Sequence, residues 1–226
     1  MLHRASAVIF DLDGVLVTTD ELHYAAWKSI ADELGIPFSR HTNHQLRGVS
    51  RMASLEVVLS AASRSFTQSE KEQLAHRKNT RFVESLQTLD AQAILPGVLA
   101  LLDQLCAMNV PCAVASSSRN ARLILDRVGL RSRMHTVVDG NDITRSKPDP
   151  QVFLLAAHQL ALAPAQCVVV EDAESGVDAA NAANMPVLGV GDPQRLAHAS
   201  LVVPSLAHIQ ASQLLALSRP PINRHE

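Results

Sequence analysis

The chain has 226 residues, of which 47% are hydrophobic and 19% charged, and this length allows one large domain or a core with a smaller inserted domain. Its net charge of −2 and its 3% aromatic residues argue against a nucleic-acid surface, which needs a basic stripe or stacking rings. No apolar run approaches the ~20 residues that span a bilayer, so we expect neither a nucleic-acid nor a membrane partner.

The first predicted element is a strand at Ala7-Val8-Ile9-Phe10, which ends at Asp11-Leu12-Asp13-Gly14. A short apolar run before a glycine turn indicates a buried strand, and open α/β sheets bind ligands beyond the carboxyl ends of such strands. Two carboxylates there need a compensating cation once they lose water, so the stretch predicts a metal site. A simple polar turn remains the alternative for this motif alone. A calcium-binding EF-hand loop is excluded, because its glycine belongs at position six and its glutamate at position twelve, whereas here the glycine is fourth and Leu22 is twelfth.

Residues 18–92 show helical patterns and no convincing strand. Apolar residues recur every four positions over 22–34, and Gly35 ends that run. A second amphipathic stretch covers 55–62, and a third helix opens with Thr67-Gln68-Ser69-Glu70, a capping-box sequence. We interpret residues 18–92 as a helical-bundle cap domain inserted after the first strand.

Strands and helices alternate beyond the cap. The predicted strands cover 110–115, 136–138, 167–170 and 186–190, the last of which closes the series, and the helices between them cover about 98–105, 120–128, 152–160 and the stretch after 176. This alternation implies right-handed βαβ units. We therefore predict an α/β fold: a Rossmann-like parallel sheet flanked by helices, formed by residues 1–17 and 93–226.

Polar clusters follow three of these strands, and a lysine precedes Pro148 between the last two. The clusters are Asp11 with Asp13, Ser116-Ser117-Ser118, and Glu171-Asp172, and the lysine is Lys147. If these residues meet at one edge of the sheet, they could support phosphoryl transfer. Mg²⁺ prefers carboxylate and phosphate oxygens as ligands, and an aspartate can be the nucleophile. A lysine neutralises the negative charge of the phosphoryl group as it moves. A P-loop kinase is disfavoured because the chain has no Walker A sequence.

In order and spacing, Asp11-Leu12-Asp13-Gly14, Ser116, Lys147-Pro148 and Glu171-Asp172 resemble the four motifs of the haloacid dehalogenase-like phosphotransferases. Further motifs are similar to those of the β-phosphoglucomutase subgroup: Thr19, His23 and Trp27, then Gly48-Val49-Ser50-Arg51, Arg77-Lys78-Asn79 and Ser116-Ser117-Ser118-Arg119-Asn120. The resemblance extends through about Pro204.

The resemblance implies a role for each matching position. Asp11 would be the nucleophile and a Mg²⁺ ligand, and Asp13 the general acid/base with its backbone carbonyl on the metal. Glu171 and Asp172 would complete the protein ligands. The phosphate- and substrate-binding residues would be Ser116, Lys147, Thr19, His23, Trp27, Gly48, Val49, Ser50, Arg51, Lys78, Ser117, Ser118, Arg119 and Asn120.

Three positions depart from the pattern of some relatives. Val17-Thr18-Thr19-Asp20 differs from a Thr-Asp-Thr sequence, Ser117 stands where a relative has Ala, and Arg47 replaces a Lys. His23, Trp27 and Lys78 could also simply pack within the cap, and Arg51 could be solvated, although a cation at a helix start favours a bound anion.

The activity that the resemblance implies is isomerisation of β-D-glucose 1-phosphate to glucose 6-phosphate, through an aspartyl-phosphate enzyme, with β-D-glucose 1,6-bisphosphate as the priming intermediate. A sugar-phosphate phosphatase uses the same core residues and is the first alternative. A phosphosugar-binding protein without turnover is the second. The three cysteines, Cys106, Cys112 and Cys167, lack C-x-x-C spacing and fit reduced core residues. With no signal peptide before Asp11, we expect a cytoplasmic monomer that acts on small sugar phosphates.

Overall fold

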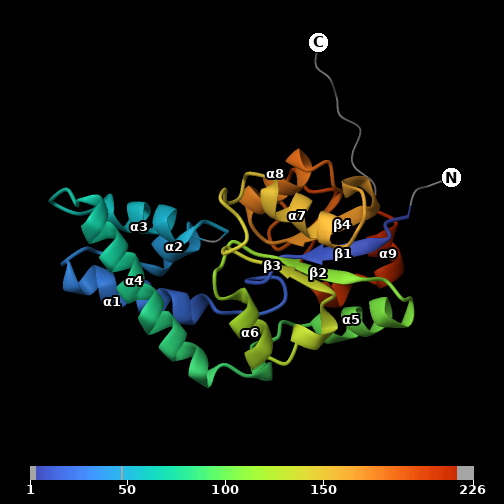
Figure 1. Ribbon diagram of the computed structural model, residues 1–226, viewed down its shortest axis with the longest axis horizontal. Helices are drawn as coiled ribbons and strands as arrows, with labels where there is room; N and C mark the ends of the chain where they lie inside the picture. The colour runs from blue at the N-terminus through green and yellow to red at the C-terminus, as the bar shows by residue number, and fades with distance from the viewer. Residues whose placement is uncertain (1–3, 47, 218–226) are drawn as a thin grey trace, which may run out of the picture.

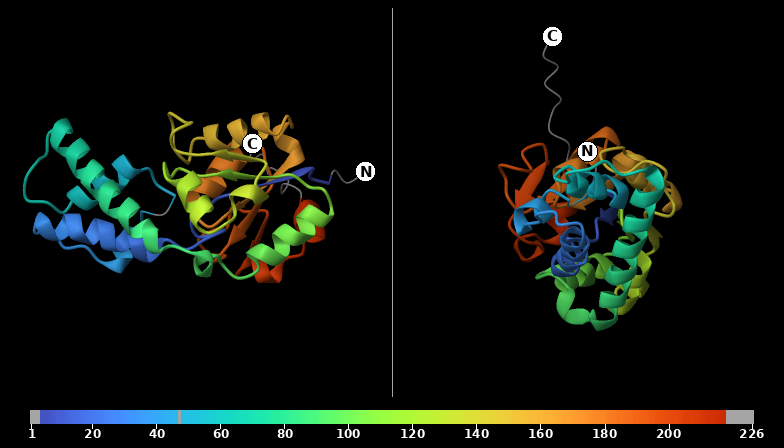
Figure 2. Two further views of the ribbon diagram at one scale, coloured as in Figure 1. Left: turned by 60° about the horizontal axis from the view of Figure 1, so that its bottom comes forward. Right: turned by 90° about the vertical axis from the view of Figure 1, so that its left-hand side faces the viewer.

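The computed structural model describes residues 4–46 and 48–217. An α/β core carries a smaller helical domain at one end (Figures 1 and 2). Within the described residues the core contains one six-stranded parallel sheet with the strand order β3-β2-β1-β4-β5-β6. This is the order of a Rossmann-like sheet, which reverses direction next to β1, and it confirms the predicted fold class.

The strands are short, and they are apolar because helices cover both faces of the sheet. They are β1 (Ala7–Phe10), β2 (Cys112–Ala115), β3 (Thr136–Val138), β4 (Cys167–Glu171), β5 (Val187–Val190) and β6 (Leu201–Val203). In β1, Ala7 and Ile9 pack into the core on one face, while Val8 and Phe10 pack into the core on the other. All four are fully buried, as the period-two geometry of a strand requires.

Helices cover the two faces in two groups (Figure 1). On one face lie α5 (Val98–Ala107), α6 (Ala121–Arg127) and α9 (Ala211–Leu215). On the other lie α7 (Gln151–Gln159) and α8 (Glu174–Ala182). Short 3₁₀ helices of one turn each lie in the loops, at Leu86–Thr88, Ala91–Ala93, Arg131–Arg133, Pro164–Gln166 and Leu206–His208.

The cap has its own apolar core, which is built from α1 (Asp20–Glu33), α2 (Arg40–His44), α3 (Arg51–Leu59) and α4 (Gln68–Ser85). The predicted capping box at the start of α4 is confirmed: Thr67 and Glu70 each accept a hydrogen bond from the other residue's backbone N–H. All four helices fall within the predicted cap, residues 18–92.

Two chain segments join the cap to the core and lie side by side. The Thr18 N–H donates to the Ala93 carbonyl (2.9 Å), and the Leu95 N–H donates to the Leu16 carbonyl (3.0 Å). Val17 and Ile94 form an antiparallel bridge between these two hydrogen bonds. We call residues 14–18 and 93–96 the hinge segments, since every covalent connection between cap and core within the described residues passes through them.

One expectation about the sheet is wrong. The strand series does not close at Val190, because β6 pairs with β5 through Leu188↔Leu201 and Val190↔Val203. The helix α9 also follows in a tail whose sequence shows no clear pattern, and it packs with α5.

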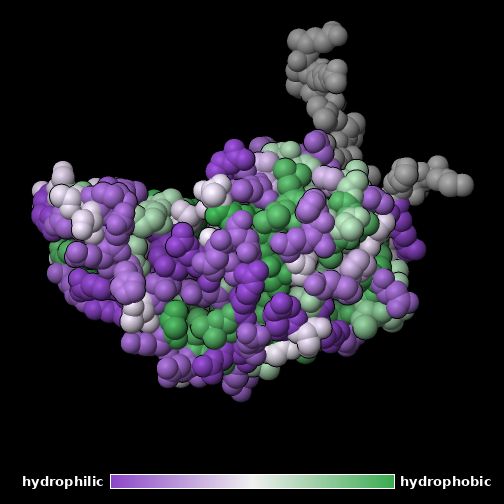
Figure 3. All heavy atoms as spheres, in the orientation of Figure 1, coloured by the Kyte–Doolittle hydropathy of each residue, from purple (hydrophilic) through white to green (hydrophobic). Residues whose placement is uncertain are grey.

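Hydrophilic side chains cover most of the cap in Figure 3, and hydrophobic residues appear mainly over the core. The large exposed hydrophobic residues, which come from five separate places in the chain, are Val57, Leu99, Met108, Leu154 and Leu201. In the described part of the chain, no helix combines the length and the apolar character that crossing a membrane requires.

Candidate functional site

The carboxyl ends of three adjacent strands bring the predicted core residues together. Phe10 of β1 is in register with Val114 of β2 and with Val170 of β4. The residues that follow, Asp11, Ser116 and Glu171, therefore gather at one edge of the sheet. All three are buried, although each is polar, so each needs a partner that replaces water.

Lys147 supplies the central charge of this edge. Its ammonium donates hydrogen bonds to Asp11 Oδ1, to Glu171 Oε1 (2.6 Å) and to the Ala115 carbonyl (3.2 Å). Burial alone would lower the pKa of Lys147, but the carboxylates of Asp11 and Glu171 outweigh it and raise the pKa above its ordinary value. Lys147 is therefore a fixed positive charge beside the predicted nucleophile. Burial raises the pKa of Asp11 to about 7, against the opposing effect of the Lys147 ammonium.

Glu171 is held by three hydrogen bonds, and a neighbouring glycine leaves room for it. Its Oε1 accepts from Lys147, and its Oε2 accepts from the N–H groups of Asp172 (2.7 Å) and Ala173 (2.8 Å). A Cβ on Gly176, in the first turns of α8, would lie only 1.8 Å from Oε1. The missing side chain at Gly176 is thus what leaves room for the Glu171 carboxylate.

Gly14 plays the same part for Asp172. Gly14 has a φ of +89°, and a Cβ there would lie 2.1 Å from Asp172 Oδ2. Only glycine both adopts this backbone conformation readily and leaves this space. The loop after β1 and the loop after β4 therefore approach each other through a glycine and a carboxylate.

Asp13 is tied to the start of the cap. The Thr19 hydroxyl donates to Asp13 Oδ1, and Thr19 is the N-cap residue of α1 without making a side-chain cap hydrogen bond. Burial raises the pKa of Asp13, while the Thr19 hydrogen bond opposes that rise. A raised pKa favours the protonated carboxyl, the form that a general acid needs before it gives up its proton.

The serine-rich loop after β2 offers hydroxyls and backbone N–H groups. Ser116 Oγ accepts from the Ser118 N–H (3.1 Å), and Ser118 Oγ accepts from the Asn120 N–H (3.2 Å). The Ser117 hydroxyl is buried and has no hydrogen-bond partner among the described residues. An unsatisfied buried hydroxyl in a cleft wall is suited to a ligand oxygen or water.

The cap lies over this edge, and two of its contacts with the core border the serine-rich loop and the start of α8. The Asn120 side-chain amide donates to Asn79 Oδ1 of α4 (2.9 Å). A Cβ on Gly48 would lie 2.8 Å from Ser175 Oγ, and Gly48 has a φ of +70°. The cap loop thus approaches the start of α8 directly.

A cleft of about 620 Å³ lies between cap and core. Fourteen of the predicted residues line it: Asp11, Asp13, His23, Trp27, Gly48, Val49, Ser50, Arg51, Lys78, Ser116, Ser117, Ser118, Arg119 and Asn120. The other four, Thr19, Lys147, Glu171 and Asp172, are buried and do not contribute to its wall. Further polar residues that were not predicted also line the cleft, among them Asp20, Asn43, Glu72 and Asn79. Of these, Asn79 lies in a motif that carried the resemblance.

Lys78 lies in the inner wall of the cap. Its ammonium lies 2.7 Å from His23 Nδ1 and over the rings of Phe82 (4.6 Å) and Trp27 (5.0 Å). Burial, helped by Arg51, lowers the pKa of Lys78 to about 7. Burial and Lys78 also lower the pKa of His23 well below its usual value. A neutral His23 can then accept a hydrogen bond from Lys78.

Two guanidinium groups face each other across the cleft, Arg51 from the cap and Arg119 from the core. Burial and the charge of Arg119 lower the pKa of Arg51, and no carboxylate among the described residues pairs with Arg51. Ser50 caps the same helix by accepting from the Ala53 N–H (3.3 Å). Two like charges beside a helix N-terminus favour a bound anion. Arg47 lies outside the described residues.

The residues near Asp11 fit a magnesium ion by their chemistry. The donors are all oxygens, those of Asp11, Asp13 and Asp172, and the space left by Gly14 accommodates one of them. Among the described residues no three His, Cys, Asp or Glu side chains already form a metal cage. Mg²⁺ usually takes only one or two carboxylates, with waters and phosphate oxygens as the other ligands, so this set is sufficient.

Three kinds of comparison with known proteins agree on the family of this chain. Residues 5–184 match the family model "haloacid dehalogenase-like hydrolase". The chain is 45% identical over 199 residues to a β-phosphoglucomutase of Bacillus subtilis, covering 87% of this chain and 88% of the relative. It is also 31% identical to a fructose-1-phosphate phosphatase of Escherichia coli, covering 84% and 98%. The crystal structure of a β-phosphoglucomutase from Clostridium difficile superposes with a TM-score of 0.87 at 36% identity, covering 91% and 93%.

Proposed function

Since this chain belongs to the haloacid dehalogenase-like hydrolase family and is an enzyme of the phosphotransferase type, we propose that it interconverts β-D-glucose 1-phosphate and glucose 6-phosphate. The observation that carries the proposal is the cleft itself. Its wall contains Asp11, which pairs with the buried Lys147, and also Arg51 of the cap, whose pKa the charge of Arg119 lowers. Two anion sites in one cleft suit a sugar with a phosphate at each end.

Asp11 is the nucleophile in this proposal. Its Oδ2 attacks the phosphorus while the bond from phosphorus to the donor oxygen breaks, which leaves an aspartyl phosphate. Lys147 holds Asp11 in place and neutralises charge as the phosphoryl group moves. The Ser116 hydroxyl and the N–H groups of its loop hold the phosphate oxygens.

Asp13 moves the proton. It protonates the leaving sugar oxygen in one direction and accepts the proton of the attacking hydroxyl in the other, a contribution of about 10²–10⁴-fold. Burial raises its pKa, which favours the protonated form that the first task needs. The Thr19 hydroxyl keeps the Asp13 carboxyl in one orientation.

The remaining cleft residues bind the sugar and its second phosphate. Arg51 grips that phosphate bidentately, with Arg119, Ser118 and Asn120 on the core side. Gly48 and Val49 contribute cap backbone, Ser50 shapes the start of α3, and Trp27, His23 and Lys78 form the inner cap wall beside the sugar. Ser117 contributes a buried hydroxyl beside the transferring phosphate.

We also propose that the enzyme depends on Mg²⁺. Asp11, the Asp13 carbonyl and Asp172 would hold the ion, which would supply positive charge to the phosphate oxygens when bound. Glu171 could join them only by sharing an oxygen with Lys147 or with the backbone N–H groups it now accepts from. We further propose that the protein acts as a monomer in the cytoplasm, where its free thiols would stay reduced.

A phosphorus NMR time course tests the proposal. The purified protein receives β-D-glucose 1-phosphate, Mg²⁺ and a trace of the 1,6-bisphosphate. Glucose 6-phosphate is the expected product. Inorganic phosphate would instead identify a phosphatase, the activity of the E. coli relative, and an unchanged spectrum would favour a binding protein without turnover.

A further inference from the structure

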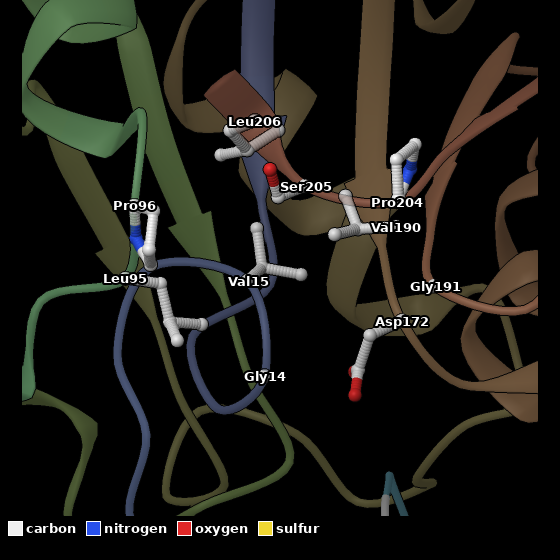
Figure 4. Close-up of a pocket in the computed structure, with 10 residues that line it drawn as sticks. All are labelled: Gly14, Val15, Leu95, Pro96, Asp172, Val190, Gly191, Pro204, Ser205 and Leu206. Carbon is white, nitrogen blue, oxygen red and sulfur yellow. The ribbon is translucent and has the colours of Figure 1, made fainter. Parts of the chain in front are cut away.

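Glycines leave room for neighbouring groups at the carboxyl edge of the sheet. Gly14 does so for Asp172, whose side chain lies beside the Gly14 turn in the pocket shown in Figure 4. Gly140 is another such glycine, and it also lines the substrate cleft. It belongs to residues 139–142, the loop after β3, which we call the brace. The neighbour for which Gly140 leaves room is the backbone of the serine-rich loop.

Three successive carbonyl groups of the serine-rich loop lie against the brace. A Cβ on Gly140 would lie only 2.5 Å from the Ser117 carbonyl oxygen. The Gly140 N–H donates a hydrogen bond to the Ser118 carbonyl (3.0 Å). The Asn141 side-chain amide donates to the Arg119 carbonyl (3.0 Å). Two residues of the brace therefore contact three peptide groups of the other loop.

These contacts set the direction of N–H groups in the serine-rich loop. In a trans peptide group the N–H points opposite to the C=O, so the N–H groups of Ser118 and Asn120 point away from the brace. They donate to Ser116 Oγ (3.1 Å) and to Ser118 Oγ (3.2 Å), respectively. A hydroxyl that accepts such a bond keeps its own proton for another acceptor. The brace thus determines where the Ser116 and Ser118 hydroxyls can donate to a ligand.

The brace is itself anchored firmly to β3. Asp139 is 1% exposed and pairs with Arg122 through one carboxylate oxygen. Its other oxygen accepts from the Asn141 N–H (2.8 Å) and side-chain amide (3.0 Å). Arg122 also donates to the Val137 carbonyl of β3 (2.7 Å), and Asp142 accepts from Arg122 and from the Asp139 N–H (both 2.9 Å). A side chain added to the brace should therefore displace the serine-rich loop and leave the brace in place.

Resting on the proposed function, we propose that Gly140 and Asn141 are positioning residues that act on two different ends of the substrate. Gly140 acts through the peptide group between residues 117 and 118 on Ser116, which would hold the transferring phosphate. Asn141 acts through the peptide group between residues 119 and 120 on the part of the loop that would bind the sugar and its second phosphate.

Two alanine variants and a control test this division. Gly140 is not a glycine of positive φ, so Gly140→Ala adds only a methyl group, which must push the Ser117 carbonyl away. Asn141→Ala removes the amide that reaches the serine-rich loop. Gly189→Ala in β5 is the matched control for the first variant, because its Cβ is also crowded, 3.1 Å from Leu196, and Gly189 neither has a positive φ nor lines the cleft.

Two measurements follow the two ends of the substrate, and neither requires mutase turnover. The rate at which acetyl phosphate phosphorylates Asp11, measured by mass spectrometry, reports the site of the transferring phosphate. The dissociation constant of glucose 6-phosphate, measured by calorimetry with Mg²⁺ on the unphosphorylated enzyme, includes the sugar site. Gly140→Ala should slow phosphoenzyme formation at least about tenfold, within the range of an overpacked contact. Asn141→Ala should weaken glucose 6-phosphate binding about two- to tenfold, as expected for one hydrogen bond, and leave phosphoenzyme formation unchanged.

Each outcome decides one question. If neither variant differs from wild type, or if Gly140→Ala loses no more than Gly189→Ala, the brace does not position the loop. If both variants lose the two functions in the same proportion, Gly140 and Asn141 are merely structural and the proposal is overturned. Release of inorganic phosphate from β-D-glucose 1-phosphate by wild type would overturn the mutase reaction alone, because a phosphatase would still bind sugar phosphates through this loop.

Absence of glucose 6-phosphate binding by wild type would overturn both the proposed function and the role of Asn141. Unfolding curves like that of wild type establish that the variants are folded. If Gly140→Ala does not fold, Asn141→Ala still tests the brace, because it removes a hydrogen bond at the exposed side of the loop and adds no atoms.

Discussion

Replacing Gly176 with alanine should destabilise the protein, although the same change within a helix normally stabilises. Gly176 is the third residue of α8 and has ordinary helical backbone, so alanine would gain up to about 1 kcal/mol from helix propensity. The new Cβ would, however, lie 1.8 Å from Glu171 Oε1 and 2.0 Å from its Cδ. The sign of the effect therefore depends on whether the Glu171 carboxylate can move.

The structure leaves that carboxylate little freedom. Glu171 is fully buried, and both its oxygens are bound, one by Lys147 and the other by two backbone N–H groups. If the carboxylate stays in place, overpacking costs about 1–3 kcal/mol. If it is driven off Lys147, a buried ion pair breaks, which costs about 3–5 kcal/mol. We expect the second outcome, and with the helix gain of about 1 kcal/mol subtracted the free energy of unfolding should fall by about 2–4 kcal/mol.

A double-mutant cycle tests this reasoning by denaturant unfolding at pH 7. The proteins are wild type, Gly176→Ala, Glu171→Ala and the double variant. Once Glu171 is truncated the collision disappears, so Gly176→Ala should then be neutral or stabilising by up to about 1 kcal/mol. A reversal of sign between the two backgrounds is the expected result. If Gly176→Ala is as stable as wild type in the native background, Glu171 does not lie where its contacts with Lys147 require.

Three further predictions concern the cleft. Asp13→Asn should lower sugar-phosphate turnover about 10²–10⁴-fold. It should slow phosphorylation of Asp11 by acetyl phosphate less, because the acetate leaving group needs little protonation. Equal losses with the two phosphoryl donors would mean that Asp13 is structural. Arg51→Ala should lower sugar-phosphate turnover roughly 30- to 5,000-fold, the equivalent of about 2–5 kcal/mol for a desolvated charge pair. It should not slow phosphoenzyme formation from acetyl phosphate, which has no distal phosphate. If the ratio of the two rates is the same as in wild type, Arg51 is not part of the distal phosphate site. Burial lowers the pKa of Lys78 to about 7. Between about pH 7 and 10.5 this lysine is therefore protonated more often in the unfolded chain than in the folded one. Its contribution to the free energy of unfolding should then rise with pH across that window. Lys78→Met should therefore stabilise the protein near pH 7, by at most about 5 kcal/mol at 1.36 kcal/mol per pH unit. This gain in the free energy of unfolding should shrink toward about pH 10.5. A gain that does not depend on pH would mean that the pKa of Lys78 is not lowered by burial.

The sequence predicted β1 to β5, and the strand that it missed, β6, lies at an edge of the sheet. β1, β2 and β4 are continuous apolar runs because helices cover both faces, and such runs are visible without a structure. β6 has only three residues, Leu201–Val203, of which one is buried, and it is a strand because β5 is beside it. Its pairing depends on tertiary position, which no local pattern contains. The same holds for α2, whose five residues are too few for a helical period.

The candidate site was predictable as a list of residues but not as a set of contacts. Carboxylates, serines and a lysine at strand ends are local features, and the sheet brings them to one edge. The contact between Lys147 and Glu171 spans 24 residues, and it depends on the path of the loop between β3 and α7. The hydrogen bond between Asn79 and Asn120 joins cap to core, so it depends on how the two domains close. Sequence identifies such residues only through resemblance.

The position of Asp13 links proton transfer to the position of the cap. Its carboxyl accepts from Thr19, the residue from which α1 starts, and its backbone bridges to Val17 in the hinge. A rotation of α1 relative to β1 must therefore either carry the Thr19 hydroxyl away from Asp13 or turn the carboxyl with it. In the proposed function, a sugar phosphate that touches both Arg51 and the core loop would bridge cap and core and stabilise the closed arrangement, whereas a single water molecule is too small to bridge them. We infer that a closed cap, rather than a special nucleophile, is what would favour a sugar hydroxyl over water as the acceptor, because the core residues of mutase and phosphatase are the same.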